Sequence, residues 1–231
     1  MTTSLPGELL EVFARSATAE YVTVDSRGQP VVWPVAPSYR PGETCIDVAH
    51  DPGHVADNPH VALLFCDPSG LETTPIVLVQ GTAHEGADAV RVRPERIYAW
   101  PGADLDAEPQ LYDANVEEVR SAHNVEPEVG HAAPEGGETE WDERLDELDD
   151  GVLAFVGPDG FPFAVRVPIE ADGGEGVIRI EADPVGAPIE PGLACLCAHD
   201  GRVHALGDLD EERGRWVLRP HRVASGAKQV G

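Results

Sequence analysis

The sequence is almost without lysine and has far fewer bases than acids. Lys228 is its one lysine, and 16 basic residues stand against 42 acidic ones, which gives a formal net charge of −26. A surface this negative repels nucleic-acid phosphates and anionic lipid headgroups, so neither nucleic acid nor a membrane is an expected partner. Apolar runs also fall short of the roughly 18 residues that cross a bilayer. Because the first ten residues, MTTSLPGELL, lack the pattern of a secretory signal, we expect a soluble cytoplasmic protein.

Cysteine is also scarce, and its placement argues against both a disulfide framework and a metal site. The four cysteines, Cys45, Cys66, Cys195 and Cys197, are few and irregularly spaced, and they lie in apolar runs. Strand alternation places Cys195, Cys197 and His199 on one face. Their spacing along an extended chain is too wide for one tetrahedral ion to reach all three, so no metal site is predicted.

The surplus of carboxylates has two interpretations. It suits a halophilic protein, since a Debye length of about 3 Å at 1 M salt screens the self-repulsion of such a surface. An acidic protein from a bacterium with a GC-rich genome is the alternative. Rising stability in concentrated salt would distinguish the first from the second.

The two halves of the sequence resemble each other. A shift of 132 residues places residues 22–52 on residues 154–184 without a gap, and it aligns Gly28 with Gly160 and Pro30 with Pro162. The same shift places 58–65 on 190–197. Beyond that, a shift of 126 aligns Gly81 with Gly207 and 93–97 (RPERI) with 219–223 (RPHRV). Matches that keep their order across the whole unit indicate an internal duplication.

Each copy has the pattern of about six short β-strands. The first copy contains the runs VTV, VVWPV, CIDVA, VALLF, IVLVQGTAH and VRV, and the second contains LAFV, FAVRVPI, VIRIEA, LACLCA, RVHALGD and RWVLR. Turn-forming segments separate them, among them residues 25–28, 67–70 and 158–160. Short antiparallel strands in this number favour a small barrel, which closes and so leaves no exposed edge.

Three helices are predicted outside the strands. The first spans about Leu5–Ser16, the second about Tyr112–His123, and the third follows Thr139, with Trp141, Leu145 and Leu148 as its apolar stripe. The last two lie in a connector, residues 98–153, that holds 17 acidic residues and two arginines. We therefore expect an N-terminal barrel over 1–97, an acidic connector over 98–151 and a C-terminal barrel over 152–231.

An ordered series of short motifs resembles the pyridoxamine 5′-phosphate oxidase-like, FMN-binding split-barrel superfamily. The series consists of Asp25-x-x-Gly28-x-Pro30, the strand 32–35, NPHVALL at 58–64, Gly81-Thr-Ala83 and RPERI at 93–97. The resemblance implies a mainly β fold of two tandem split barrels that form an intramolecular pseudo-dimer with a few short helices. The whole molecule would then be a monomeric pseudo-dimer, or a homodimer of pseudo-dimers.

The resemblance also implies a flavin groove between the barrels. The family commonly binds the flavin phosphate with Lys or Arg before the short helix, whereas this sequence has His50 and His54 there and neither Lys nor Arg. When protonated, these two histidines are candidate phosphate contacts, and the alternative is that they are surface residues. Arg166 and Arg179, each in a predicted strand, are substitutes for a bidentate phosphate contact, although either also suits a solvent-exposed or carboxylate-paired role. Trp33 and Gln80 match positions near the groove, where Trp33 provides a stacking face or packs in the core.

The expected function is therefore a flavin- or deazaflavin-binding protein, with FMN as the first candidate cofactor. Its chemistry would be that of a small oxidoreductase moving a hydride between the flavin and a small acceptor, with no obligatory acid–base residue. The alternative is a non-catalytic duplicated barrel that has lost its flavin site and binds a small ligand, haem or a protein partner. For haem, His204 and His221 are the candidate ligands.

Overall fold

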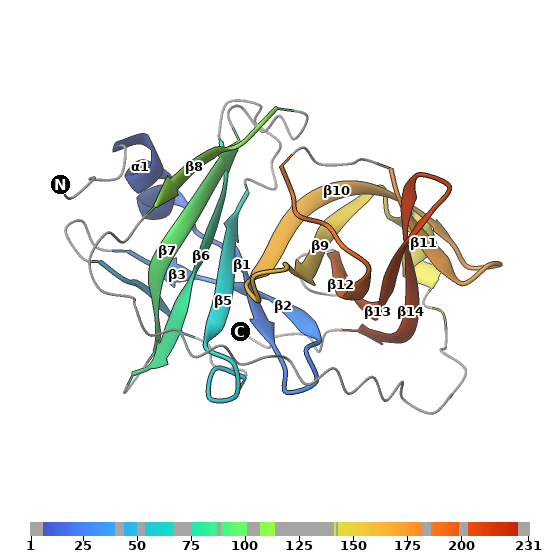
Figure 1. Ribbon diagram of the computed structural model, residues 1–231, viewed down its shortest axis with the longest axis horizontal. Helices are drawn as coiled ribbons and strands as arrows, with labels where there is room; N and C mark the ends of the chain where they lie inside the picture. Colours follow the sequence, from blue (N-terminus) through green and yellow to red (C-terminus); the bar gives the residue numbers. More distant parts are fainter. Residues whose placement is uncertain are drawn as a thin grey trace.

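A computed structural model of the chain describes residues 7–39, 44–49, 54–66, 75–86, 89–100, 107–113, 141, 143–181, 186–198 and 203–225. Two antiparallel β-barrels lie side by side in it, the N-terminal one at the left of Figure 1 and the C-terminal one at the right. No helix in the described part of the chain is long and apolar enough to span a bilayer.

The described residues of the N-terminal half form one helix and eight strands. They are α1 (Gly7–Arg15), β1 (Ala19–Val24), β2 (Pro30–Val35), β3 (Pro37–Ser38), β4 (Ile46–Val48), β5 (His60–Phe65), β6 (Ile76–Glu85), β7 (Val90–Trp100) and β8 (Gln110–Asp113). The sheet runs β2-β1-β5-β6-β7-β4-β3, with β8 added to β7. Because β2 and β3 are consecutive along the chain, the two ends of this sheet lie close together and the sheet is barrel-like.

The C-terminal half repeats this arrangement. Its elements are the 3₁₀ helix η2 (Glu143–Glu147) and the strands β9 (Asp150–Val156), β10 (Pro162–Asp172), β11 (Val177–Ile180), β12 (Gly192–Ala198), β13 (Val203–Glu212) and β14 (Arg215–Ser225). They form a closed barrel in the order β10-β11-β14-β13-β12-β9. With β10 equivalent to β2 and β3 together, the strand order of the two barrels is the same. The prediction of two tandem barrels is confirmed.

Strand register confirms the duplication at the level of single residues. Val24 pairs with Pro30 in the first barrel, and Val156 pairs with Pro162 in the second, which is the same pair shifted by 132. The β3–β4 and β10–β11 pairs obey the same shift. The turns agree as well, since Gly28 and Gly160 both have φ of 81° in a five-residue connection between strands, a conformation that favours glycine.

One segment of the predicted alignment is wrong by a single residue. Relative to the paired strands β1 and β9, Ala62 occupies the position of Cys195 and Leu64 that of Cys197, so the shift here is 133 rather than 132. The loop before β12 thus contains one more residue than the loop before β5. In a strand, a slip of one residue exchanges the inner and outer faces. Cys195 and Cys197 therefore lie on the outer face of the C-terminal barrel, where it packs against the N-terminal barrel, and not in its interior.

Two apolar clusters hold the molecule together. One fills the N-terminal barrel, from Leu9 of α1 to Tyr21, Leu63 and Val79. The other unites the interior of the C-terminal barrel with residues on the outer face of the first barrel, among them Val22, Ala62, Leu64, Leu78 and Trp100. Because this second cluster is continuous across the junction, the barrels bury a common apolar surface, as the pseudo-dimer prediction requires.

The helix predictions meet three different outcomes. The first is confirmed, since α1 spans Gly7–Arg15 and buries Leu9, Val12 and Phe13. The second is wrong at its start, because Gln110–Asp113 forms strand β8 beside β7, and the rest of that segment lies outside the described residues. In place of the third, a 3₁₀ helix at Glu143–Glu147 buries Leu145 and Leu148 as expected, while Thr139 lies outside the described residues.

Candidate functional site at the junction of the barrels

The junction is reciprocal, as expected of a pseudo-dimer. Strand β10 packs on β5 just as β2 packs on β12, and β10 contacts β1 just as β2 contacts β9. Equivalent surfaces thus face each other around an approximate two-fold axis, the arrangement of a symmetric dimer within one chain. The outer edge of β2, which pairs with β1 on its other side, is covered by the second barrel (Figure 1).

Side chains from both barrels satisfy backbone carbonyl groups at this junction. The Nε2 of Gln29 donates to the Ala194 carbonyl at 2.9 Å, and the Nε2 of Gln80 donates to the Pro162 carbonyl at 2.9 Å. The Nε2 of His204 lies 2.9 Å from the carbonyl oxygen of Val32. Since that oxygen only accepts, the His204 Nε2 carries the hydrogen. These three bonds give the carbonyl groups of Ala194, Pro162 and Val32 a partner from the other barrel and so tie the two barrels together.

Trp33 and His54, both predicted site residues, come together through Thr23. The indole Nε1 of Trp33 donates to the Thr23 hydroxyl at 3.1 Å, and that hydroxyl lies 2.9 Å from the Nδ1 of His54. Thr23 is completely buried. Its hydroxyl hydrogen therefore needs an acceptor, and His54 Nδ1 supplies one, which leaves the hydrogen of a neutral His54 on Nε2. The second barrel has Val165 and Phe155 at the positions of Trp33 and Thr23, so this network belongs to one barrel only.

His204 brings the second barrel to the same place. Its ring lies 6.5 Å from the ring of Trp33, and the His54 ring lies 6.2 Å from Trp33 on its own barrel. Burial lowers the pKa of His204, and the bond to Val32 only partly opposes that effect. His204 is thus a neutral imidazole at neutral pH. The result is a partly buried group of one indole and two imidazoles, supplied by both barrels. It lies beside the edge of β2 that does not pair with β1.

Gln80 is at the junction but apart from Trp33. It lies in the row of residues that runs from β6 through Ala62 and Val22 to Val32, on the outer face, whereas Trp33 pairs with Tyr21 on the inner face. Gln80 is 2% exposed, and its Oε1 has no hydrogen-bond partner among the described residues. A buried acceptor without a donor is costly, so this oxygen lowers the stability of the junction.

The two arginines predicted to bind phosphate are both held by carboxylates. Arg166 makes a bidentate contact with Asp150, through Nε at 3.2 Å and NH2 at 2.8 Å. It also lies beside Cys66, whose pKa is raised by burial and lowered in part by that guanidinium. Arg166 is thus near the junction, yet its charge is already neutralised.

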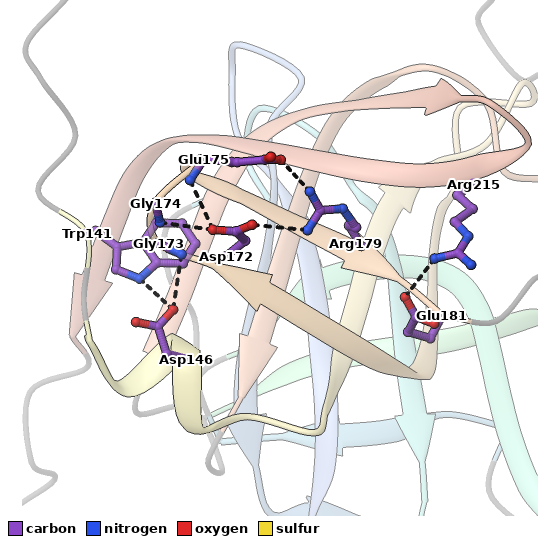
Figure 2. A network of polar contacts seen from close by, with 9 residues as sticks. All are labelled: Trp141, Asp146, Asp172, Gly173, Gly174, Glu175, Arg179, Glu181 and Arg215. Carbon is purple, nitrogen blue, oxygen red and sulfur yellow. Dashed lines mark hydrogen bonds and ion pairs between the residues drawn. The ribbon is translucent and has the colours of Figure 1, made fainter.

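Arg179 lies at the far end of the second barrel, in the network drawn in Figure 2. It pairs with Asp172 at 3.5 Å and with Glu175, while Asp172 also accepts hydrogen bonds from the backbone of Gly174 and Glu175. These contacts hold the pKa of Asp172 below its ordinary value, the backbone bond from Glu175 contributing most. The neighbouring hollow of about 540 Å³ is lined by Trp141, Asp146, Glu170, Ala171, Asp172, Gly173 and Gly174. Its acidic lining is unsuited to a phosphate.

The remaining candidates are placed as follows. His50 and His199 lie outside the described residues. His221 is 3.7 Å from Asp208, on the surface. Two described histidines, His54 and His204, each lie near the ring of Trp33. No signal in the sequence pointed to His204 as a neighbour of Trp33.

Sequence reasoning missed a second set of contacts on the opposite flank of the junction. The ring of Phe161 stacks on His60 with centroids 4.1 Å apart, and the guanidinium of Arg96 lies 4.7 Å from the Phe161 centroid. Arg96 also pairs with Asp159 at 2.5 Å. The hairpin turn between β9 and β10 is thereby fastened to the first barrel.

Comparison with known proteins gives likenesses to solved structures alone. A scan against protein families finds no match, and no curated protein matches significantly. Similar structures include HupZ of Group A Streptococcus (21% identity, TM-score 0.35, covering 42% of this chain and 94% of HupZ). A protein of the pyridoxinephosphate oxidase family from Clostridium acetobutylicum (12%, 0.37, 46% and 92%) and a haem-binding protein from Mycobacterium smegmatis (15%, 0.37, 48% and 60%) also match. These likenesses are low in identity and in TM-score, and they do not assign a family to the chain. The strand order of the two sheets makes this chain a protein of two tandem, related β-barrels.

Proposed function

We propose that the chain binds a planar cofactor of the flavin or deazaflavin type at the junction of its barrels. The observation that supports this most is the convergence of Trp33 and His54 from the first barrel with His204 from the second. Aromatic and imidazole faces that meet between two barrels suit a flat ring, and the fixed hydrogen bonds of Thr23 hold the indole and one imidazole in place.

The residues fit the ring of FMN well, whereas the arginines first predicted to bind its phosphate fit poorly. Bound flavin would supply hydride chemistry, and Trp33, His54 and His204 would hold and orient its ring. Arg166 and Arg179 do not serve its phosphate, because carboxylates already neutralise them. With His204 neutral and no described carboxylate in this group, the residues position a ring rather than transfer protons.

The test is a titration of the purified protein with FMN and with a deazaflavin, following quenching of cofactor fluorescence. We expect saturable binding, and a purified protein that carries its cofactor will absorb near about 450 nm for FMN, a property of the cofactor itself. Trp33→Leu should weaken binding by about tenfold, in line with the loss of one stacking contact. Trp216→Leu, which alters a partly buried tryptophan at the far end of the C-terminal barrel, serves as the control for general damage.

The second candidate is a duplicated barrel without a flavin, which binds another small ligand. Arg166 and Arg179, the two arginines predicted to bind the phosphate, are both paired with carboxylates, and this favours the second candidate. Absence of FMN and deazaflavin binding in a folded protein would support this candidate and refute the first. Haem binding would be recognised by a Soret band, and its loss in His54→Ala or His204→Ala would identify the ligand.

A further inference from the structure

The approximate two-fold symmetry of the junction relates each contact on one flank to a counterpart on the other. On one flank, the turn between β9 and β10 carries Asp159, which pairs with Arg96 of β7 at 2.5 Å. The shift of 132 that relates the two hairpins places Arg27 at the position of Asp159. The shift of 126 that relates β7 to β14 places Arg222 at the position of Arg96. An ion pair on one flank therefore corresponds to two arginines on the other.

Backbone geometry supports both equivalences. The turns that carry Arg27 and Asp159 have the same pair of backbone bonds, from Asp25 to Gln29 and from Gly157 to Phe161, and the same closing bond to the glycine nitrogen. Arg222 lies opposite Leu206 just as Arg96 lies opposite Gln80, and each pair is followed by the same irregularity in register. Equivalent backbones that contact equivalent barrels bring Arg27 and Arg222 to the same neighbourhood.

Both arginines of this pair are exposed. Within the described residues, neither Arg27 nor Arg222 makes an ion pair with a carboxylate. The nearest acid in sequence, Asp25, uses its Oδ1 to accept the backbone N–H groups of Arg27 and Gln29. Two unpaired guanidinium groups are notable in a chain with 42 acids and 16 bases. Since like charges repel, they are most stable together with an anion between them.

Arg222 also borders the ring-binding group described above. His204 lies directly opposite Ala224, so Arg222, two residues from Ala224 on the same strand, shares the outer face with His204. Arg27 precedes β2 by a short turn, and the free edge of β2 carries the Val32 carbonyl that His204 contacts. The arginine pair and the aromatic group thus lie along one flank of the junction.

We infer that Arg27 and Arg222 form an anion site that binds the phosphate group of a phosphorylated ligand. Planar guanidinium forks match phosphate oxygens and bind a dianion more tightly when two act together. The inference of a phosphate rests on the arginine pair, and its assignment to the cofactor rests on the proposed function. It provides the cations that the segment before NPHVALL lacks.

Calorimetric titration with pyrophosphate, at fixed ionic strength, tests the anion site without any cofactor. We expect binding by the unmodified chain and at least about tenfold weaker binding by Arg27→Gln/Arg222→Gln, which loses two charge-assisted contacts. Arg15→Gln/Arg91→Gln removes two exposed arginines elsewhere and is the matched control for net charge. Equal losses in both double variants, or no pyrophosphate binding by the unmodified chain, would overturn the inference.

Arg27→Asp gives an independent test that does not depend on a destabilised variant. It recreates on this flank the pair that Asp159 and Arg96 make on the other, so we expect lost pyrophosphate binding together with a melting temperature that is unchanged or higher. Binding that persists in Arg27→Asp would contradict the inference.

FMN and riboflavin separate this inference from the proposed function. If both hold, the Arg27→Gln/Arg222→Gln variant loses affinity for FMN and keeps its affinity for riboflavin, which has no phosphate. Pyrophosphate binding without flavin binding would refute the cofactor and retain the anion site. If the variant binds flavin with the same ratio of FMN affinity to riboflavin affinity as the unmodified chain, the proposed cofactor is retained and the anion site is refuted.

Discussion

At the scale of single residues, the backbone of Val32 in the first barrel is a point of contact with the second barrel. Its carbonyl oxygen is bound by His204, and its backbone also contacts the thiol of Cys195. Both partners lie on the outer face of the C-terminal barrel, on the neighbouring strands β13 and β12. Two single-residue predictions follow from their burial.

His204 should make stability depend on pH. Burial lowers its pKa in the folded protein, so the unfolded chain binds the proton more tightly. Its contribution is complete above the unfolded value of about 6.5 and is lost as the pH falls through the lower, folded value. The free energy of unfolding should therefore drop between pH 7.5 and 5.5 by more in the unmodified protein than in His204→Gln. Parallel pH profiles for the two proteins would contradict this assignment.

Cys195 should be chemically inert in the folded protein. Burial raises the pKa of its thiol to about 12, so almost no thiolate exists at pH 8. We expect iodoacetamide at pH 8 to label Cys45, which is partly exposed, and to label Cys195 after unfolding in urea. Mass spectrometry of tryptic peptides measures both. Rapid labelling of Cys195 in the native protein would show that the junction opens.

At the scale of elements, each barrel depends on one glycine at a bulge in its long hairpin. Gly81 in β6 and Gly207 in β13 occupy equivalent positions, each at a shift in register. A Cβ at Gly81 would lie 2.2 Å from the Arg93 carbonyl oxygen, and one at Gly207 would lie 2.0 Å from that of Arg219. The close approach of two backbones explains why both copies have glycine there.

Gly81→Ala and Gly207→Ala should each destabilise the protein by about 2 kcal/mol or more, because the clash is with backbone that cannot rotate away. Gly174→Ala is the control, since its Cβ would meet only a flexible carboxylate at 3.3 Å and should cost less than about 0.5 kcal/mol. Urea denaturation followed by circular dichroism measures all three. Similar stabilities for all three variants would refute the steric argument.

At the scale of the whole molecule, charge decides the conditions in which the fold is stable. A net charge of −26 on 231 residues repels itself, and most described ion pairs are at the surface, where each contributes little. The apolar cluster that the two barrels share must hold them together against that repulsion.

Thermal stability should therefore rise with salt. Between about 0.1 M and 1 M, the Debye length falls from about 10 Å to about 3 Å, which screens the repulsion between surface carboxylates. We expect an increase of several degrees in the melting temperature in KCl over this range, in line with a gain of about 1 kcal/mol or more. A melting temperature that stays constant or falls would contradict the halophilic interpretation.

The sequence by itself determined the duplication, the strand-rich halves and the barrel architecture, because strand period, turn residues and repeated motifs such as Gly28 and Gly160 are local properties of the chain. It also identified Trp33 and His54 as candidates. It misplaced the segment around Cys195 by one residue, since sequence identity does not reveal a one-residue loop insertion, whereas hydrogen-bonded register does.

Only the tertiary structure decided which candidates act together. Arg166 and Arg179 have the same sequence pattern of an arginine in a strand, yet each is paired with a carboxylate. Asp150 comes from the paired strand β9, and Asp172 lies across the turn between β10 and β11. Trp33 and Gln80 were grouped by resemblance, yet they point to opposite faces of one sheet. The physical reason is that charge pairing and facing depend on strand register and turn geometry, which are fixed only when the strands of each barrel pair.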